Sequence, residues 1–328
     1  MAKRNAFAGG QSARGFGLTS FSDEDMESIH LATLEVLERT GVFVEADGAL
    51  DILTDGGCSV DRESHIVRIP PHIVEEAIAS TPPRVTLCGR DPRNDVVLEP
   101  GRVSFCTFSE GIMIVDARTG EYRPTTKRDV AEIGRLTDFL SEMDTYQISV
   151  VSRDVPTQTY EIHNLEAALL NTTKPLGTGP FEVEDTQVVI DMAAAVAGGA
   201  DELRQRPLIY LCGCPVSPLR LPTGCTNFIV AAARAGLPSL PISMALAGGT
   251  GPVALAGTLV THNSEILASL VLAQATERGA PVIYGSSTTA LDLRSAAAAV
   301  GSPECAMINA AVAHMARHYR LPSFVAGL

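Results

Sequence analysis

Two residues one helical turn apart, His262 and Glu265, could together do acid–base chemistry. They lie in the run Thr261-His262-Asn263-Ser264-Glu265, and a spacing of three residues places both side chains on one face of a helix. An imidazole and a carboxylate can exchange protons with a substrate near neutral pH. A lone histidine in an apolar helix is, however, more often a hydrogen-bonded structural residue, so the pair by itself does not indicate catalysis.

A second group of charged residues flanks the run Gly301-Ser302-Pro303. Asp292 and Arg294 precede this run and Glu304 follows it. Serine as the N-cap, proline at the first helical position and glutamate in the first turn form the ordinary signature of a helix start. The same carboxylates could hold a cationic substrate, and the spacing leaves both interpretations open.

Metal and phosphate chemistry are weakly indicated. The seven cysteines are scattered and odd in number, which is typical of reduced thiols. Cys212-Gly213-Cys214 has no second Cys or His pair at ligand spacing, so we expect no metal. Gly248-Gly249-Thr250-Gly251 precedes a helix, but no Lys or Arg follows within the next turn, which argues against a phosphate site.

Composition excludes some classes of partner. The 328 residues are 45% hydrophobic, which indicates a globular core, and the net charge of −13 disfavours nucleic acid and anionic membranes, both polyanions. The first ten residues lack the apolar segment of a secretory signal. The longest uncharged stretch, residues 235–264, is broken by Pro and Gly, so it is not expected to span a membrane. We expect a cytoplasmic protein.

Strand and helix patterns alternate along residues 101–328. Near-continuous apolar runs, typical of parallel strands buried on both faces, predict strands at 103–107, 146–151, 175–180, 208–214, 241–246, 282–287 and 323–326. Amphipathic or apolar patterns between them predict helices at 127–140, 159–171, 185–197, 223–235, 253–277 and 303–319. This alternation indicates right-handed βαβ units and a parallel sheet.

The predicted fold class is an α/β TIM-type (β/α)₈ barrel. A doubly wound sheet would carry a Gly-rich turn after its first strand, whereas only Gly111 follows Thr107 closely. A closed barrel needs eight strands and about seven are predicted, so we expect an incomplete barrel over 101–328 that lacks its last helix-strand-helix segment. Residues 1–100 are expected to form an N-terminal α+β cap.

The carboxyl ends of barrel strands carry the chemistry of such folds, and here they are rich in small residues. Gly177-Thr178-Gly179 is one example and Tyr284-Gly285-Ser286-Ser287-Thr288-Thr289 is another. Small residues let a ligand approach the backbone closely. Barrel rims also need tight turns, which use the same residue types, so the small residues indicate either a ligand site or tight turns.

Four co-linear stretches resemble the trimethylamine:corrinoid methyltransferase family. They are residues 255–263 (LAGTLVTHN), 284–289 (YGSSTT), 301–304 (GSPE) and 321–327 (LPSFVAG), and the N-terminal helix at 29–37 matches as well. The resemblance implies a TIM-type barrel that moves a methyl group from an amine to the Co(I) of a separate corrinoid protein. It also implies that no cofactor is bound directly, because the cobalamin is carried by the partner. A homo-oligomer is expected.

Trimethylamine members of this family carry pyrrolysine after the Ala-Gly that ends strand seven, where this chain has Leu328. We therefore expect a chain truncated at the pyrrolysine position, with pyrrolysine present in the full-length protein. The remaining roles are assigned by the resemblance together with position. The expected catalytic positions are Leu328 and Glu304, and the expected substrate-binding residues are Tyr284, Ser287 and Asp292, supported by His262 and Glu265.

Three functional hypotheses follow. A neutral tertiary amine is a poor methyl donor because its leaving group is an amide anion, and Leu328 supplies no electrophile that would activate it. The first hypothesis is therefore a trimethylamine methyltransferase that is inactive as this chain. The second is a pyrrolysine-independent methyltransferase of quaternary amines such as glycine betaine, which are already activated. The third is a non-catalytic fragment that binds a corrinoid protein.

Overall fold

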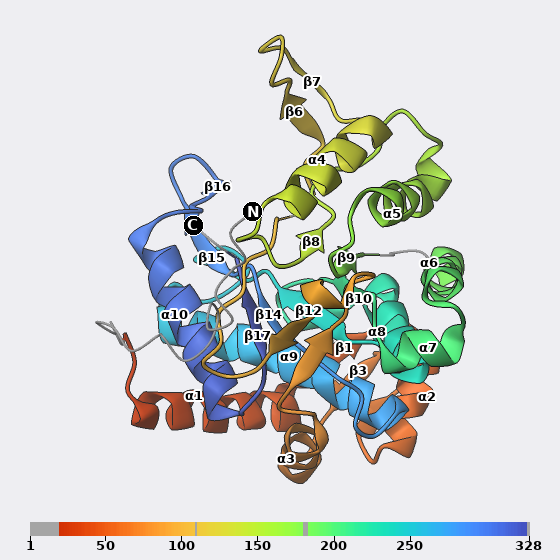
Figure 1. The fold of residues 1–328 in the computed structure, drawn as a ribbon. Coiled ribbons are helices and arrows are strands. Elements are labelled where there is room, and N and C mark those ends of the chain that lie inside the picture. The colour runs from red at the N-terminus through yellow and green to blue at the C-terminus, as the bar shows by residue number, and fades with distance from the viewer. Residues whose placement is uncertain (1–19, 109, 180–182, 327–328) are drawn as a thin grey trace.

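Six parallel strands form the central sheet of the protein. The computed structural model describes residues 20–108, 110–179 and 183–326. The strand order is β17-β14-β12-β10-β9-β8, and every neighbouring pair is parallel. The strands curl into a half-barrel (Figure 1). Their bounds are β8 Tyr146–Gln147, β9 Leu176–Thr178, β10 Ile209–Gly213, β12 Ser239–Ser243, β14 Tyr284–Ser286 and β17 Ser323–Val325.

Each of these strands lies within or overlaps a strand predicted from the sequence, whereas the predicted strand at 103–107 is wrong. That segment makes one isolated parallel bridge, between Cys106 and Thr145, the residue that precedes β8. The N–H of Phe105 donates to the Asp144 side chain at 2.7 Å, so a carboxylate takes a position that a backbone carbonyl would hold in a ladder. Val103 and Phe105 are also exposed, so burial does not favour a strand here.

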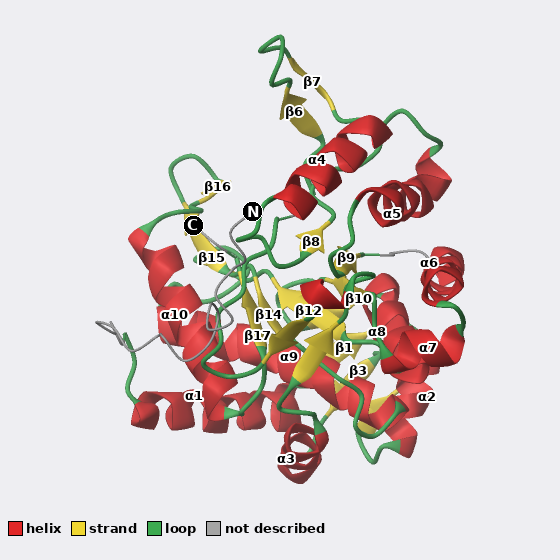
Figure 2. Ribbon diagram, in the orientation of Figure 1, coloured by secondary structure: helices red, strands yellow, loops and turns green. Residues whose placement is uncertain are grey.

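The helices predicted between the strands are confirmed. They are α4 Lys127–Phe139, α5 Tyr160–Asn171, α6 Val183–Ala197, α8 Thr223–Ala235, α9 Leu255–Thr276 and α10 Pro303–His318, with a short additional α7 at Ala200–Gln205. The Ser302 side chain accepts a hydrogen bond from the Cys305 N–H, as expected of an N-cap. Helices α8, α9 and α10 lie around the outer side of the strands (Figure 2).

The N-terminal region is α+β. Its helices are α1 Asp23–Glu35, continued by one π-helical turn at Val36–Thr40, α2 Asp47–Asp55 and α3 Pro71–Ser80. Its sheet has the order β11-β1-β3-β2, with β1 Val42–Val44, β2 Ser59–Asp61, β3 Ile66–Arg68 and β11 Arg220–Leu221. Because β11 comes from the loop between β10 and α8, this sheet joins the N-terminal region to the barrel.

Three short antiparallel strand pairs lie outside the central sheet. Strands β4 Val85–Leu87 and β5 Val96–Leu98 form one hairpin, and β6 Met113–Val115 and β7 Tyr122–Pro124 form another that projects from the molecule (Figure 1). Strand β15 Thr289–Asp292 pairs with β16 Ala297–Ala298 and, in parallel, with β13 Leu246–Ala247. The last two pairings lie beyond the carboxyl ends of β12 and β14.

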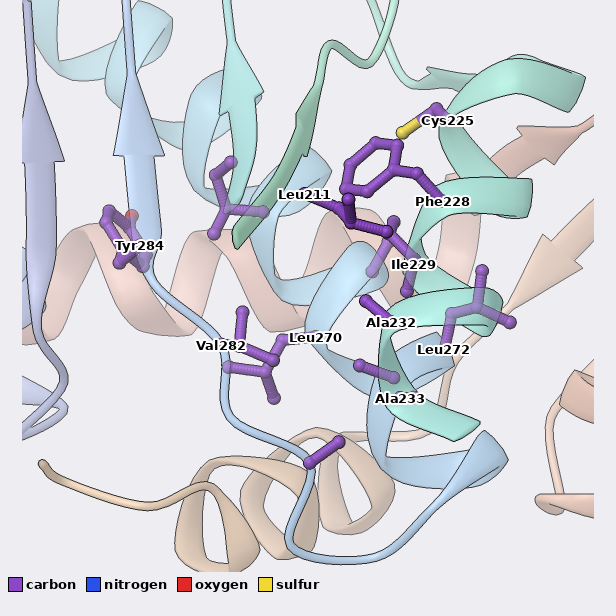
Figure 3. Close-up of a cluster of buried hydrophobic side chains, with 14 of the residues drawn as sticks. Leu211, Cys225, Phe228, Ile229, Ala232, Ala233, Leu270, Leu272, Val282 and Tyr284 are labelled. Atoms are coloured by element: carbon purple, nitrogen blue, oxygen red, sulfur yellow. The ribbon is translucent and has the colours of Figure 1, made fainter. Parts of the chain in front are cut away.

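The two faces of the sheet bury different cores. Side chains on the outer face, Leu211 among them, pack on α8 and α9 through residues such as Phe228 and Leu270 (Figure 3). On the inner face, Tyr210, Cys212, Leu240, Ile242 and Ile283 pack together with Val85, Leu87 and Val96 of the β4–β5 hairpin. The outer core contains residues from both 1–100 and 101–328, and the division into cap and barrel stays a prediction.

Helix α9 is the most apolar of the long helices. Among the residues that the structure describes, it alone is long and apolar enough to cross a membrane. Within the fold 72% of its apolar window is buried. Burial on all sides accounts for that composition, since a helix that is apolar all round belongs in the interior of a large protein.

Candidate active site

Tyr284, a predicted substrate-binding residue, points away from the barrel interior. Its side chain is fully buried, and its hydroxyl donates to Asn263 Oδ1 of α9 at 2.6 Å. Its ring packs edge-to-face on His262, with the centroids 5.4 Å apart. Tyr284 therefore joins β14 to α9 on the outer face of the sheet. A role in contacting substrate stays a prediction that this geometry does not favour.

His262 and Glu265 are both buried on α9. His262 Nδ1 lies 3.2 Å from Thr288 Oγ1, and burial lowers the pKa of the imidazole to about 3, so the ring is neutral. Glu265 accepts hydrogen bonds from the side chains of Ser217 and Ser243, at 2.9 and 2.6 Å, and from a backbone N–H. Burial raises the pKa of Glu265. The carboxylate thereby fixes the loop after β10 to the end of β12.

The other predicted residues are dispersed. By alternation along β14, Ser287 follows Ile283 on the inner face, and it is half-buried at the barrel mouth. Asp292 is exposed at the β15–β16 turn, where it accepts from the Arg294 N–H and the Ser295 hydroxyl. Glu304 is exposed in the first turn of α10. The structure does not bring these carboxylates to Tyr284, and Leu328 lies outside the described residues.

A polar cavity that sequence reasoning missed lies at the carboxyl ends of β8 and β9. It is small, about 20 Å³, which is room for one water-sized group. Its polar lining side chains come from the loop after 107, from β8, from the start of α5 and from β9: Glu110, Gln147, Tyr160, Glu161, Asn164 and Thr178. In a (β/α)₈ barrel this end of the strands is where catalytic groups are placed.

Gln147 is the most deeply buried of these groups, with 2% of its surface exposed. It pairs in register with Gly177 of β9. A Cβ at position 177 would collide with Gln147 Oε1 and with the Tyr210 ring, so only glycine leaves space for both side chains. The small residues of Gly177-Thr178-Gly179 mark this end of β9 in the sequence, but nothing in the sequence connects them with Gln147.

The carboxylates of the cavity differ in environment. Glu161 is buried, and the Tyr160 hydroxyl donates to its Oε1 at 3.0 Å. Glu110 is exposed as a whole residue, yet desolvation by the protein atoms around its carboxyl group raises its pKa. Its Oε1 lies 3.5 Å from the point where a Cβ of Gly179 would stand. Glu110, Glu161 and Gln147 thus line one small cavity at the mouth of the half-barrel.

The larger cavity lies elsewhere. About 410 Å³ in volume, it is lined by inner-face residues near the amino ends of the strands, including Tyr210, Leu240 and Ile283, and by α10 residues such as His314. Its position away from the carboxyl ends makes it a poor candidate for the reaction centre. Among the described residues no cluster of three or more His, Cys, Asp or Glu is placed to hold a metal ion.

Comparison with known proteins identifies the family. Residues 12–328 match the family model described as trimethylamine methyltransferase (MTTB). The chain belongs to the trimethylamine methyltransferase family. It is 48% identical over 320 residues to the trimethylamine methyltransferase MttB of Desulfitobacterium hafniense, covering 98% of this chain and 64% of that relative. It is 40% identical over 338 residues to MttB of Methanosarcina thermophila, covering all of this chain and 69% of that relative.

The chain is also similar to a more distant relative with a different name. A glycine betaine methyltransferase of D. hafniense is 30% identical over 303 residues, covering 92% of this chain and 63% of that protein. Among solved structures, the hydroxylamine complex of MtmB superposes with a TM-score of 0.56 at 13% identity, covering 95% of this chain and 69% of that one. That likeness supports the α/β barrel fold. The chain thus spans about two thirds of the length of these proteins.

Proposed function

We propose that this chain, when pyrrolysine occupies position 328, transfers a methyl group from trimethylamine to the Co(I) of a corrinoid carried by a partner protein. The match of residues 12–328 to trimethylamine methyltransferases carries the proposal. In the reaction, Co(I) supplies the electron pair of the new Co–C bond, the C–N bond breaks, and the amine keeps the C–N electron pair. The corrinoid is the methyl acceptor, hence a substrate presented by the partner at the barrel mouth.

The nitrogen must leave as a neutral amine, so it must be cationic when the C–N bond breaks. The resemblance to the family implies a pyrrolysine electrophile for this purpose at position 328, where the chain has Leu328. Ala326, two residues earlier, donates to Ser286 O at 2.9 Å and accepts from Asn309 Nδ2 at 2.7 Å. These contacts fix Ala326, at the end of β17, beside the end of β14.

The test compares the chain as written with a variant that carries pyrrolysine in place of Leu328. Each is incubated anaerobically with cob(I)alamin and trimethylamine, and the loss of the Co(I) spectrum and the release of dimethylamine are followed. We expect transfer by the pyrrolysine variant and none by the Leu328 chain. Absence of transfer by both proteins, with the cognate corrinoid protein also supplied, would overturn the proposal.

A second candidate is demethylation of a quaternary amine. It is supported by Leu328 and by the similarity to the glycine betaine methyltransferase. If this second candidate is right, the Leu328 chain should transfer a methyl group from glycine betaine to cob(I)alamin in the same assay. Binding of a corrinoid protein without any methyl transfer would instead support a non-catalytic role.

A further inference from the structure

The carbonyl oxygen of Ala326, at the end of β17, is bound by a side chain instead of by the neighbouring strand. In a parallel ladder the N–H and C=O of one residue point to the same neighbour. The Ala326 N–H follows this pattern and donates to Ser286 O of β14 at 2.9 Å. Its C=O instead accepts from Asn309 Nδ2 of α10 at 2.7 Å. The N–H of Thr288, which would continue the ladder, donates to Ser286 Oγ at 3.2 Å. Asn309 thus takes the place of a ladder partner at Ala326.

Packing alone does not account for an asparagine at position 309. The residue is 9% exposed, and its side-chain oxygen Oδ1 is buried with no hydrogen-bond partner. Only Nδ2 can donate to a carbonyl oxygen, so the bond to Ala326 determines which amide atom is left unpaired. Ile308 and Val312 beside it on α10 are fully buried. Leucine, which has the same branched shape, would suit this environment better.

The free energies of these two features have opposite signs. A buried acceptor without a donor costs more than a single hydrogen bond to a backbone carbonyl contributes. Asn309 therefore lowers the stability of the fold while it fixes the backbone of Ala326. A residue that fixes geometry at the expense of stability is typical of functional positions.

We propose that Asn309 is a positioning residue, which fixes the backbone that carries the reactive group of residue 328. This inference rests on the proposed function. Position 328 follows Ala326 by two residues, which span at most about 7 Å of chain. Asn309 acts through Ala326 and not by contact with the amine. Displacement of a reacting group by about 1 Å can lower a rate about 100-fold, so a single hydrogen bond at this point can control turnover.

The first experiment introduces Asn309→Leu into the pyrrolysine variant of the full chain. With trimethylamine and cob(I)alamin, we expect kcat to fall about 10- to 100-fold and KM for trimethylamine to change less than about threefold. The urea unfolding midpoint should stay the same or rise, because leucine removes the unpaired oxygen and the carbonyl of the half-buried Ala326 can bond to water. A lower midpoint with unchanged kcat would show a structural role alone and overturn the proposal.

Asn171→Leu is the matched control. Asn171 lies on α5, and its Nδ2 also donates to a backbone carbonyl, Ala167 O, at 2.8 Å. Because this bond holds no part of β17, the control should leave kcat unchanged. An equal fall of kcat in Asn171→Leu and Asn309→Leu would overturn the proposal. If Asn309→Leu does not fold, Asn309→Asp, which keeps the size of the side chain and lacks the N–H donor, is measured in the same way.

The second experiment needs no methyl transfer. Hydrogen–deuterium exchange of the chain with Leu328 is followed by mass spectrometry in the peptide of residues 321–328. Loss of the bond to Asn309 should make the Ala326 amide, which donates to Ser286, exchange about tenfold faster in Asn309→Leu. Asn171→Leu should exchange like the wild type. Equal exchange in the wild type and in Asn309→Leu overturns the proposal.

The two experiments separate the failure of this inference from that of the proposed function. If the pyrrolysine variant transfers no methyl group even with the corrinoid protein supplied, the proposed function is wrong, and exchange decides whether Asn309 fixes this backbone. If the pyrrolysine variant is active and Asn309→Leu equals it in kcat, the proposed function stands and the positioning role of Asn309 is refuted.

Discussion

Replacing Gly177 by alanine puts a methyl group into the most crowded point of the inner face. The new Cβ would stand 2.5 Å from the Tyr210 ring and closer still to Gln147 Oε1. Carbon atoms in contact prefer about 3.5–4.0 Å, so a shift of about 1 Å is needed. Tyr210 is 2% exposed and cannot rotate freely. Overpacking of this kind costs about 1–3 kcal/mol, and loss of the hydrogen bond from Gln147 to Cys212 adds about 1 kcal/mol.

We therefore expect Gly177→Ala to lower the free energy of unfolding by about 2–4 kcal/mol. Urea unfolding followed by far-ultraviolet circular dichroism measures the change. Gly48→Ala is the control, because its Cβ would meet nothing within 4 Å and it lies in α2, where alanine is favoured by up to about 1 kcal/mol. An unfolding midpoint for Gly177→Ala equal to or above that of the wild type would refute the packing argument.

Three further predictions concern buried polar groups. Burial raises the folded-state pKa of Glu265, so the stability that this group contributes is present below pH 4.5 and is lost as pH rises through the raised pKa. The urea midpoint of Glu265→Gln should therefore rise relative to that of the wild type as pH increases. Arg123 lowers the pKa of Asp129 to about 2, so Asp129→Asn should destabilise the protein above pH 3.8 and the difference should shrink as pH falls toward 2. Tyr319→Phe removes the hydroxyl that contacts His30 Nδ1 at 2.9 Å and should cost about 1–2 kcal/mol in thermal or urea unfolding; an unchanged midpoint would show that the contact is unimportant.

Elements of the barrel were predictable because the strands are continuous apolar runs between amphipathic helices. The segment 103–107 has the same pattern but lies at the margin of the sheet, where an Asp144 carboxylate replaces a backbone partner. An apolar run therefore indicates where a strand can form, whereas its pairing into the sheet depends on neighbours that the local sequence does not specify. The cap of α10 at Ser302 was predictable because capping is a local interaction.

The candidate site was harder to predict, for a geometric reason. A strand buried on both faces carries apolar residues throughout, so its sequence does not say which side chains point inward. Tyr284 is predicted to bind substrate, but it points outward to Asn263. Gln147 and Gly177 meet only because β8 and β9 pair in that register, and Glu110 reaches the cavity beside Gln147 from a loop. Such contacts require the tertiary structure.

The central position of helix α9 determines how the protein unfolds. It packs on α1, α2 and α3 of the N-terminal region and also on α8 and α10. Separation of either set of helices from α9 would expose this largely apolar 22-residue helix to water. Neither the N-terminal helices nor α8 and α10 can therefore detach from α9 alone at a low free-energy cost. Amide hydrogens of α1 and of α8 should accordingly exchange with solvent through the same rare, concerted opening, and partial proteolysis should release no stable N-terminal fragment.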